Sequence, residues 1–283
     1  MKIDLHAHST VSDGTDTPIQ LVRKAAEAEL DVVALTDHDS SAGWDDAVRT
    51  ASRSGVCLIR GAEFTCLWQG VAVHMLSYLH EPAFPPLVEE LHRVRQARLD
   101  RARVMVEMVA QDFPITWEDV VAQTGPGAAV GRPHVADALV AAGVAPNRTA
   151  AFKEILHSRS PYCVRHYSSD AIVMVEIIRA AGGVPVFAHP GAIHRQRLVG
   201  DQAIMEMAEA GLAGLEVYHR DNPAPQRARL LALAEQLDLL VTGSSDYHGE
   251  GKANRLGENT TPLEVLLEIV AQGELGPAGA DKI

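Results

Sequence analysis

Residues 1–15 read MKIDLHAHSTVSDGT and place two histidines directly after a short apolar stretch. The stretch 2–5 is typical of a buried strand, and His6 and His8 follow it at positions i and i+2. Because successive side chains of an extended segment point to opposite faces, His6 and His8 face the same side while Ala7 is turned away. Paired imidazoles at a strand end indicate a metal site.

The rest of the chain repeats this alternation of strand and helix. Apolar runs alternate with helix-like stretches, which is typical of a parallel sheet or barrel. The apolar runs are 2–5, 31–36, 56–64, 71–78, 184–189, 213–219 and 239–248. The expected helices are 17–29, 168–181, 201–210 and 223–237, with Thr17, Asp201 and Asn222 as N-caps. A chain of 283 residues that is 47% apolar fits one large α/β domain with an insertion.

The alternation stops in the middle of the chain. Residues 82–165 are helical and strongly charged in pattern, and we interpret them as a helical insertion, or cap, beside the barrel. The barrel then comprises residues 1–81 and 166–272. The glycine-rich, polar tail 273–283 is expected to be loose.

Composition excludes several classes of protein. The net charge of −12 disfavours binding to duplex DNA, which requires a basic surface. The chain has neither a signal-peptide pattern nor an apolar run of the ~18 residues that span a bilayer, so we expect a cytoplasmic protein without a membrane role. No obligatory protein partner is evident. Cys57, Cys66 and Cys163 lack CxxC spacing, so we expect them to be reduced and mostly buried.

Ligand-type side chains gather at the ends of the predicted strands. They are His6, His8, Asp37, His38, Asp39, Glu63, His74, His189, Asp246 and His248. A single histidine there is more often structural, but parallel strands bring their carboxyl ends to one edge, so this set predicts a shared metal site. Imidazole and carboxylate ligands without thiolate suit Mn²⁺, Zn²⁺ or Fe²⁺, and Mg²⁺ is the harder alternative. The set exceeds what one ion needs, so we expect two or three divalent ions, with Mn²⁺ preferred.

Six motifs carry a resemblance to a known family. They are HAHSTVSDG (6–14), TDHDS (36–40), GAEF (61–64), VHMLSY (73–78), AHPG (188–191) and GSSDYHG (243–249). Together they resemble the PHP (polymerase and histidinol phosphatase) family of the amidohydrolase superfamily. Within it the chain is similar to nucleoside 3′,5′-bisphosphate phosphatases and to an exoribonuclease acting on short RNA 5′ ends. AQDFPITWEDV (110–120) and EVYHRDNP (216–223) resemble AMP-binding actinobacterial members.

The resemblance implies a distorted (β/α)₇ barrel that holds three ions. The implied ligands are His6, His8, Glu63 and Asp246 for the first ion, Glu63, His74 and His189 for the second, and Asp13, His38 and His248 for the third. Asp13 stands where histidinol phosphate phosphatases of this family have a histidine. A carboxylate at that position favours Mn²⁺ or Mg²⁺.

The implied reaction is hydrolysis of phosphate monoesters of small nucleotides. Its expected target is the 3′-phosphate of nucleoside 3′,5′-bisphosphates, attacked by a hydroxide that bridges two ions. The predicted catalytic residues are Asp246, His248 and His194, with His194 or a metal-bound water protonating the leaving group. The alternatives are a 5′-to-3′ exoribonuclease on short RNAs and a cyclic-nucleotide phosphodiesterase. A C–N hydrolase would need a lysine at a strand end, and a non-catalytic sensor would have lost ligands.

Cations that bind the substrate are expected in the insertion and after the AHPG motif. The resemblance implies that arginines of the insertion bind a nucleotide phosphate, which makes Arg98 and Arg101, one helical turn apart, candidates. Their alternative role is a solvated helix face paired with acidic neighbours. Arg132 is expected in a turn fixed by Gly131 and Pro133, where its guanidinium can bind phosphate through two hydrogen bonds. Further candidates are His134, Arg195, Arg197, Glu216, Tyr218 and His219. For His134 the alternative role is helix capping or packing. For Arg195 and Arg197 the alternative is a place in a surface loop.

Overall fold

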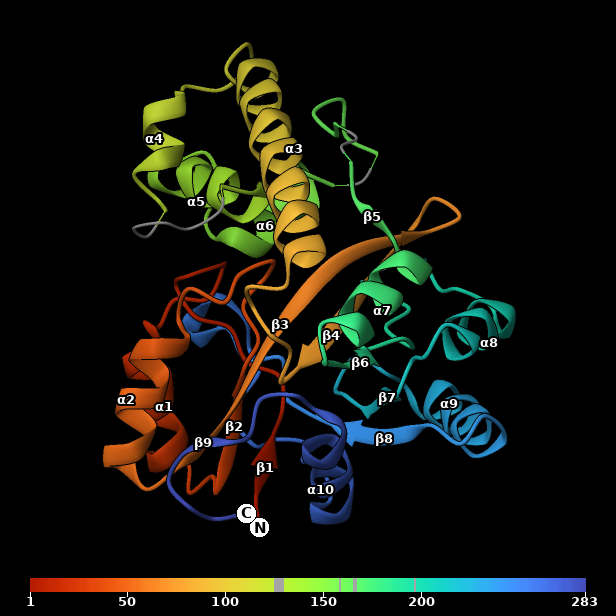
Figure 1. Cartoon of the computed structure of the whole chain (residues 1–283). Helices are drawn as coiled ribbons and strands as arrows, with labels where there is room; N and C mark the ends of the chain where they lie inside the picture. Colours follow the sequence, from red (N-terminus) through yellow and green to blue (C-terminus); the bar gives the residue numbers. More distant parts are fainter. Residues whose placement is uncertain (125–129, 158, 165–166, 196) are drawn as a thin grey trace.

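A sheet that curves into a nearly closed barrel forms the centre of the protein (Figure 1). The computed structural model describes residues 1–124, 130–157, 159–164, 167–195 and 197–283. Within them the strand order is β1 (Ile3–Asp4), β2 (Val32–Leu35), β3 (Cys57–Trp68), β4 (Val71–Tyr78), β6 (Val184–Phe187), β7 (Gly214–Tyr218) and β8 (Leu240–Gly243). A parallel bridge between Ala7 and Tyr247 joins the segments that follow β1 and β8, so the two edges of the sheet meet.

One strand runs against the predicted direction. The run 71–78 was expected to form another βα unit, but β4 pairs antiparallel with both β3 and β6. Gln69 and Gly70 join β3 to β4 in a tight turn, both with positive φ (46° and 79°). The sequence pattern placed Glu63 at a strand end. Because β3 continues to Trp68, Glu63 lies instead in the middle of a long two-stranded ribbon.

Helices cover the outside of the barrel. They are α1 (Pro18–Glu27), α2 (Trp44–Ser54), α7 (Ala171–Ala180), α8 (Asp201–Glu209), α9 (Ala224–Gln236) and α10 (Leu263–Gln272). Thr17 caps α1 as predicted, with Oγ1 accepting from the Gln20 amide at 3.2 Å. The other two cap predictions are wrong by one residue. Asp201 is the first helical residue of α8, and Pro223 is the N-cap of α9 in place of Asn222.

A group of helices between β4 and β5 (Ser169–Asp170) lies over one end of the barrel (Figure 1). These helices are α3 (Pro85–Val109), α4 (Trp117–Val121), α5 (Arg132–Ala141) and α6 (Arg148–Glu154). They pack around their own hydrophobic core, which includes Met105, Val109, Val120, Val135 and Leu139. Part of the stretch predicted to lack a strand, 125–129, lies outside the described residues.

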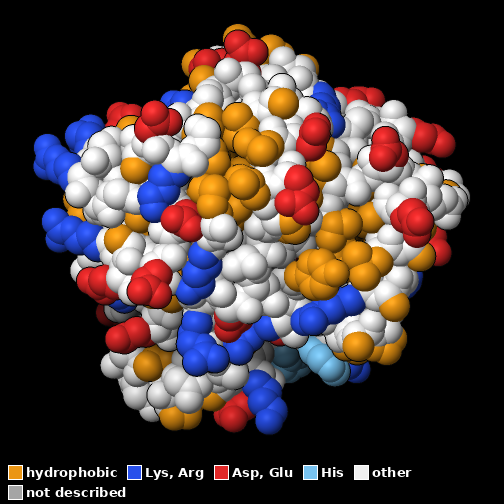
Figure 2. Space-filling model, turned by 90° about the horizontal axis from the view of Figure 1, so that it is seen from below, with side chains coloured by type: hydrophobic (Ala, Val, Ile, Leu, Met, Phe, Trp, Pro, Cys, Tyr) orange, Lys and Arg blue, Asp and Glu red, His pale blue; other side chains and the backbone are white. Residues whose placement is uncertain are grey.

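The chain termini lie together at the end of the barrel away from these helices (Figure 1). The tail, expected to be loose, contains β9 (Ala278–Gly279), which pairs antiparallel with β3. Seen from that end, the surface mixes hydrophobic patches with side chains of both charges (Figure 2). Cys57 and Cys66 are buried, and Cys163 is exposed. Of the helices in the described ranges, none combines the length and the apolar character needed to cross a bilayer.

Candidate metal centre

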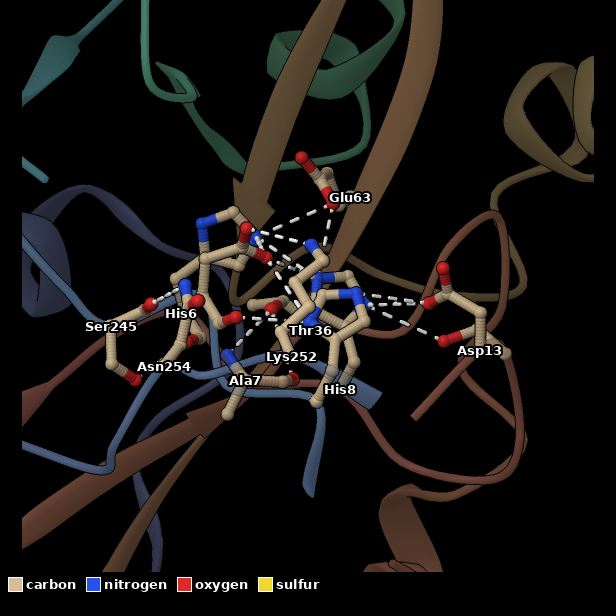
Figure 3. Close-up of polar contacts among 12 residues, drawn as sticks. His6, Ala7, His8, Asp13, Thr36, Glu63, Ser245, Lys252 and Asn254 are labelled. Carbon is tan, nitrogen blue, oxygen red and sulfur yellow. Dashed lines mark hydrogen bonds and ion pairs between the residues drawn. The ribbon is translucent and has the colours of Figure 1, made fainter. Parts of the chain in front are cut away.

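His6 and His8 lie where the first strand opens into the mouth of the barrel (Figure 3). Both rings face the same side, as the spacing predicts, and their Nε2 atoms are 3.0 Å apart. Ala7 points away, and its amide donates to the side-chain hydroxyl of Thr36 at 3.1 Å. Extended backbone therefore places two imidazoles side by side in a fully buried position.

Glu63 is the centre of the histidine cluster. Its carboxylate is 1% exposed and has imidazole nitrogens on both oxygens. The nitrogens lie at 2.8 Å (His74) and 3.2 Å (His189) from Oε1 and at 3.1 Å (His8), 3.3 Å (His6) and 3.3 Å (His38) from Oε2. Burial alone would raise the pKa of Glu63, but the charges of the surrounding histidines outweigh it and hold this pKa well below its usual value. The carboxylate is therefore ionised.

The ligand-type atoms form three groups among the described residues, each with its atoms within 4.8 Å of one another. We name them the barrel cluster (His6, His8, Glu63, Asp246), the ribbon cluster (His38, Glu63, His74) and the loop cluster (His8, Asp13, His38, His248). They differ slightly from the sets implied by the resemblance. His38 stands in the ribbon cluster where His189 was expected, although His189 still lies beside Glu63.

Glu216 orients His6 from behind. Glu216 Oε1 is 2.9 Å from His6 Nδ1, and Glu216 Oε2 accepts from the His189 amide at 2.8 Å. Because Nδ1 is bound to this carboxylate, Nε2 is the nitrogen that faces Glu63 and Asp246. The sequence suggested that Glu216 contacts ribose or base, but in the structure its two oxygens bind His6 and the His189 amide.

Asp246 uses its two oxygens differently. Oδ1 faces the barrel cluster, 3.5 Å from His6 Nε2 and 3.4 Å from His8 Nε2. Oδ2 binds Lys252 Nζ at 2.9 Å and Arg195 Nη1 at 2.7 Å. Burial raises the pKa of Asp246, but these two cations and the nearby histidines lower it well below its usual value. The structure thus places Arg195, a predicted substrate contact, on a predicted metal ligand.

Lys252 is a site residue that no motif in the sequence indicates. It stands six residues after Asp246, beyond the short 3₁₀ helix η1 (Gly249–Gly251). That turn brings Lys252 back over Asp246, and its side chain remains 29% exposed. A lysine outside the predicted strand ends carried no signal that would have indicated this contact.

The loop cluster is centred on Asp13, which lies on the loop after the first strand. Asp13 Oδ1 is 3.1 Å from His248 Nε2 and 3.9 Å from His38 Nε2. His248 Nδ1 donates to the Asp246 carbonyl at 2.9 Å, which leaves Nε2 facing Asp13. The loop that carries Asp13 passes so close to the strand end that a Cβ on Gly14 would lie 2.5 Å from the His8 carbonyl oxygen.

The buried polar atoms at the mouth of the barrel indicate whether the residues there fit metal ions. Within the described part of the chain, Asp13 Oδ1, His38 Nδ1 and His248 Nε2 are buried and lie within ion-pair distance of other site atoms, but they make no hydrogen bond of good geometry. Leaving such atoms unsatisfied costs free energy, so a bound species that uses their lone pairs is favoured. Converging imidazole nitrogens and carboxylate oxygens are the donor set of Mn²⁺, Zn²⁺ and Fe²⁺. The residues present fit divalent ions.

The arginines predicted to bind substrate lie where the insertion meets the barrel. Arg98 Nη2 binds Asp39 Oδ2 at 2.5 Å and Thr65 Oγ1 at 3.0 Å, so the solvated-face alternative does not describe it. Burial, with the nearby charges of Arg98 and Arg132, lowers the pKa of Arg101 to about 9. Arg132 is the first residue of α5 and not part of a turn, and its guanidinium lies 5.4 Å from the centre of the Phe152 ring.

Three further predicted site residues are histidines. His134 is buried, and its Nδ1 accepts from the Gly131 amide at 3.0 Å, which matches the capping alternative. His219 is fully buried, with Nδ1 accepting from the Asp221 amide and Nε2 lying 3.8 Å from Asp246 Oδ2. His194 is exposed on the loop after β6.

Known proteins are similar in sequence to this chain along most of its length. A family model for the PHP domain matches residues 4–131. The 3′,5′-nucleoside bisphosphate phosphatase of Chromobacterium violaceum is 30% identical over 254 residues, which cover 89% of each chain. A 5′-3′ exoribonuclease of Haemophilus influenzae is 29% identical, covering 95% of this chain and 97% of its own.

A solved structure agrees with the fold. The protein from Bifidobacterium adolescentis, solved as a candidate metal-dependent phosphoesterase, superposes with a TM-score of 0.94 at 45% identity, covering 96% of both chains. The fold expected from the sequence, a distorted α/β barrel of the PHP type, is thereby confirmed. Histidines and carboxylates grouped around one buried glutamate, on this fold and with these relatives, lead to one conclusion: the chain belongs to the PHP family and is a metal-dependent phosphoesterase.

Proposed function

We propose that this protein hydrolyses phosphate monoesters of small nucleotides, with the 3′-phosphate of nucleoside 3′,5′-bisphosphates as its substrate group. The observation that carries the proposal is the buried Glu63 carboxylate with histidines on both oxygens, beneath an insertion that supplies arginines. The relative from Chromobacterium violaceum, named for this activity, supports the choice of substrate.

The three clusters share residues, so we propose that they hold two or three Mn²⁺ ions close together. Glu63 belongs to the barrel and ribbon clusters, while His8 and His38 connect both of these to the loop cluster. When bound, divalent ions supply Lewis-acid charge that activates water and offsets negative charge on phosphoryl oxygens. Asp246 and His248 orient this centre, because Lys252 and Arg195 hold one Asp246 oxygen while the other faces the histidines.

Binding of the nucleotide falls to the insertion in this proposal. Arg98, Arg101 and Arg132 lie close enough for their charges to lower the pKa of the central guanidinium. An anionic substrate relieves that repulsion, and planar guanidinium groups match phosphate oxygens in geometry. A bisphosphate has a second phosphate to occupy this cationic region while the first is cleaved.

The proton for the leaving oxygen is assigned to His194 in this proposal. Its exposed side chain follows β6 on the same loop as Arg195, which binds Asp246. His219 lies beside Asp246. Its Nδ1 accepts a hydrogen bond from the Asp221 amide, so Nε2 carries the proton and faces Asp246. We propose that His219 donates a hydrogen bond from Nε2 to the substrate.

The test is release of inorganic phosphate from adenosine 3′,5′-bisphosphate with added Mn²⁺, with the nucleotide product identified by chromatography. We expect 5′-AMP, and a loss of activity in His8→Ala. His92→Ala is the matched control, because His92 is an exposed histidine of α3. Short RNAs and cyclic nucleotides are run in parallel. Faster release of mononucleotides from RNA, or faster opening of a cyclic ester, would contradict the proposed substrate.

A further inference from the structure

The tip of the loop that carries Asp13 is bound by the insertion. Arg148, the first residue of α6, donates from Nη1 to the Asp13 carbonyl oxygen at 3.1 Å. His134 of α5 hydrogen-bonds the Ser12 backbone. Arg148 and His134 therefore hold the backbone of loop 9–16 at two successive residues, Asp13 and Ser12. Both lie more than a hundred positions away from this loop in the sequence.

Arg148 is well fixed for this task. Asp137 of α5 binds it through two parallel contacts, Nε to Oδ1 at 2.8 Å and Nη2 to Oδ2 at 2.6 Å. A paired guanidinium and carboxylate of this kind fixes the plane of the arginine, so the remaining nitrogen is aimed at one acceptor. That acceptor is the carbonyl of Asp13, so the orientation of the loop tip depends on the folded α5–α6 pair.

A second contact reaches the other loop of the same cluster. Arg98 of α3 binds Asp39, the residue directly after His38. Asp39 is 1% exposed and has a positive φ of 50°, a conformation that is uncommon for non-glycine residues. The same guanidinium also binds Thr65 of β3. α3 thus ties the backbone next to His38 to the ribbon.

We propose that the helical insertion is a positioning element for the loop cluster. Arg148, His134 and Arg98 are its positioning residues, and they hold the loops that present Asp13 and His38. Ion binding at the loop cluster and docking of the insertion onto the barrel therefore stabilise each other, since coupling between two sites is reciprocal. This inference rests on the metal-dependent function proposed above, and it adds a role for the insertion besides substrate binding.

The barrel cluster does not share this dependence. Its orienting contacts come from the barrel itself, from Glu216 of β7 to His6 and from Lys252 to Asp246. Loss of an insertion contact should therefore weaken one class of ion and leave the others bound. Contacts behind metal ligands typically change affinity by about 10–100-fold.

The first test measures Mn²⁺ binding by equilibrium dialysis with elemental analysis for Arg148→Gln. Arg148 lines a cavity of about 220 Å³ together with Thr15, Asn147 and Glu250, so its truncation removes hydrogen bonds with little loss of packing. Arg229→Gln is the matched control, because Arg229 also binds one carboxylate and one backbone carbonyl, far along the barrel wall. We expect the weakest-binding ion to lose about 10–100-fold in affinity in Arg148→Gln alone.

Each result has one meaning. Equal affinities in Arg148→Gln and the wild type overturn the inference and leave the proposed function standing. Equal weakening of all ions, or the same loss in Arg229→Gln, also overturns it. A wild-type protein that binds no Mn²⁺ overturns the proposed function and this inference together.

The second test uses the reciprocal effect and does not need the arginine variant to fold. We expect Mn²⁺ to slow trypsin cleavage within residues 82–165 of the wild-type protein by about 5- to 150-fold, the usual range of coupling between sites. Asp13→Asn should lose most of this protection while it still binds ions at the barrel cluster. Protection that is equal in Asp13→Asn and the wild type overturns the coupling.

Discussion

The barrel cluster and the loop cluster use the same kinds of ligand but are held in different ways. All members of the barrel cluster are buried, and they come from strands or strand ends of the sheet. In the loop cluster, the Asp13 and His38 side chains are 17% and 14% exposed. Asp13 stands on a loop, and His38 follows β2 and forms a parallel bridge with Glu63. One cluster is thus formed mainly by the sheet, whereas the other also has a loop ligand, Asp13, whose backbone the insertion contacts.

Charge separates the two clusters as well. Burial lowers the pKa of His8, but hydrogen bonds to Asp246 and Glu63 outweigh it and raise this pKa to about 9. For His248, burial and the charges of Lys252 and His8 dominate, and they lower its pKa to about 4. The barrel cluster contains two carboxylates and the loop cluster only one, so once metal ions displace the histidine protons the barrel cluster attracts positive charge more strongly. We expect the barrel cluster to fill at lower metal concentration than the loop cluster.

The largest effect is expected from Glu63→Gln. This change removes the charge that the barrel and ribbon clusters share and leaves the loop cluster intact. Phosphate release at saturating Mn²⁺ should fall by about 10³-fold or more, because the charge that positions the ions is lost. Bound Mn²⁺ should also decrease in the same samples, measured by elemental analysis.

Glu206→Gln is the matched control for this change. Glu206 lies on α8 and accepts a hydrogen bond from Trp68 Nε1 at 2.9 Å, outside the barrel mouth. It should keep wild-type activity. Activity of Glu63→Gln within tenfold of the wild type would show that the shared carboxylate is not the centre of the site.

Much of the barrel cluster was predictable because it depends on local periodicity. His6 and His8 share one side for the reason that any extended segment alternates its side chains. The hairpin was missed although a signal was present, since the apolar run continues past Glu63 to Trp68 and the next run begins at Val71. Two residues between apolar runs, one of them glycine, indicate a hairpin turn.

The parts that were not predictable depend on contacts between distant segments. Glu216 reads as an ordinary strand residue, and only the closed sheet brings it behind His6. Asparagine is a residue type that favours helix N-caps, yet the side chain of Asn222 accepts a hydrogen bond from the Gly191 amide at 3.0 Å. The attachment of Arg148 to the Asp13 carbonyl has no sequence signal, because a backbone acceptor can be supplied by any residue.

An intermediate effect is expected from Glu216→Gln, the counterpart of the Arg148 variant on the barrel side. The amide keeps the size of the side chain but removes the charge that orients His6 Nδ1–H. The affinity of the most tightly bound Mn²⁺ should fall by about 10–100-fold, while the weakest ion is unaffected. Equilibrium dialysis measures both. Weakening of the loop-cluster ion instead would remove the distinction between the two clusters.

The smallest effect concerns a histidine that belongs to neither cluster and so reports on the scaffold alone. His80 is 1% exposed between Trp44 and Phe64, with Nδ1 2.8 Å from Ser77 Oγ. Burial lowers its pKa from 6.5 to about 4, so folded His80 stays neutral at pH values where the unfolded chain binds a proton. Its contribution to stability is complete above pH 6.5 and is lost as the pH falls from 6.5 towards 4.

His80→Asn removes this titration while the cluster histidines remain in both proteins, so their contributions cancel when the two are compared without metal. The variant is less stable at pH 7.5 because packing is lost, but its deficit should shrink by about 2 kcal/mol at pH 5. Urea unfolding at both pH values, with a chelator present, measures the change. A deficit that stays constant with pH would show that His80 is not held neutral, and the acid sensitivity of the fold would then have to come from the clusters themselves.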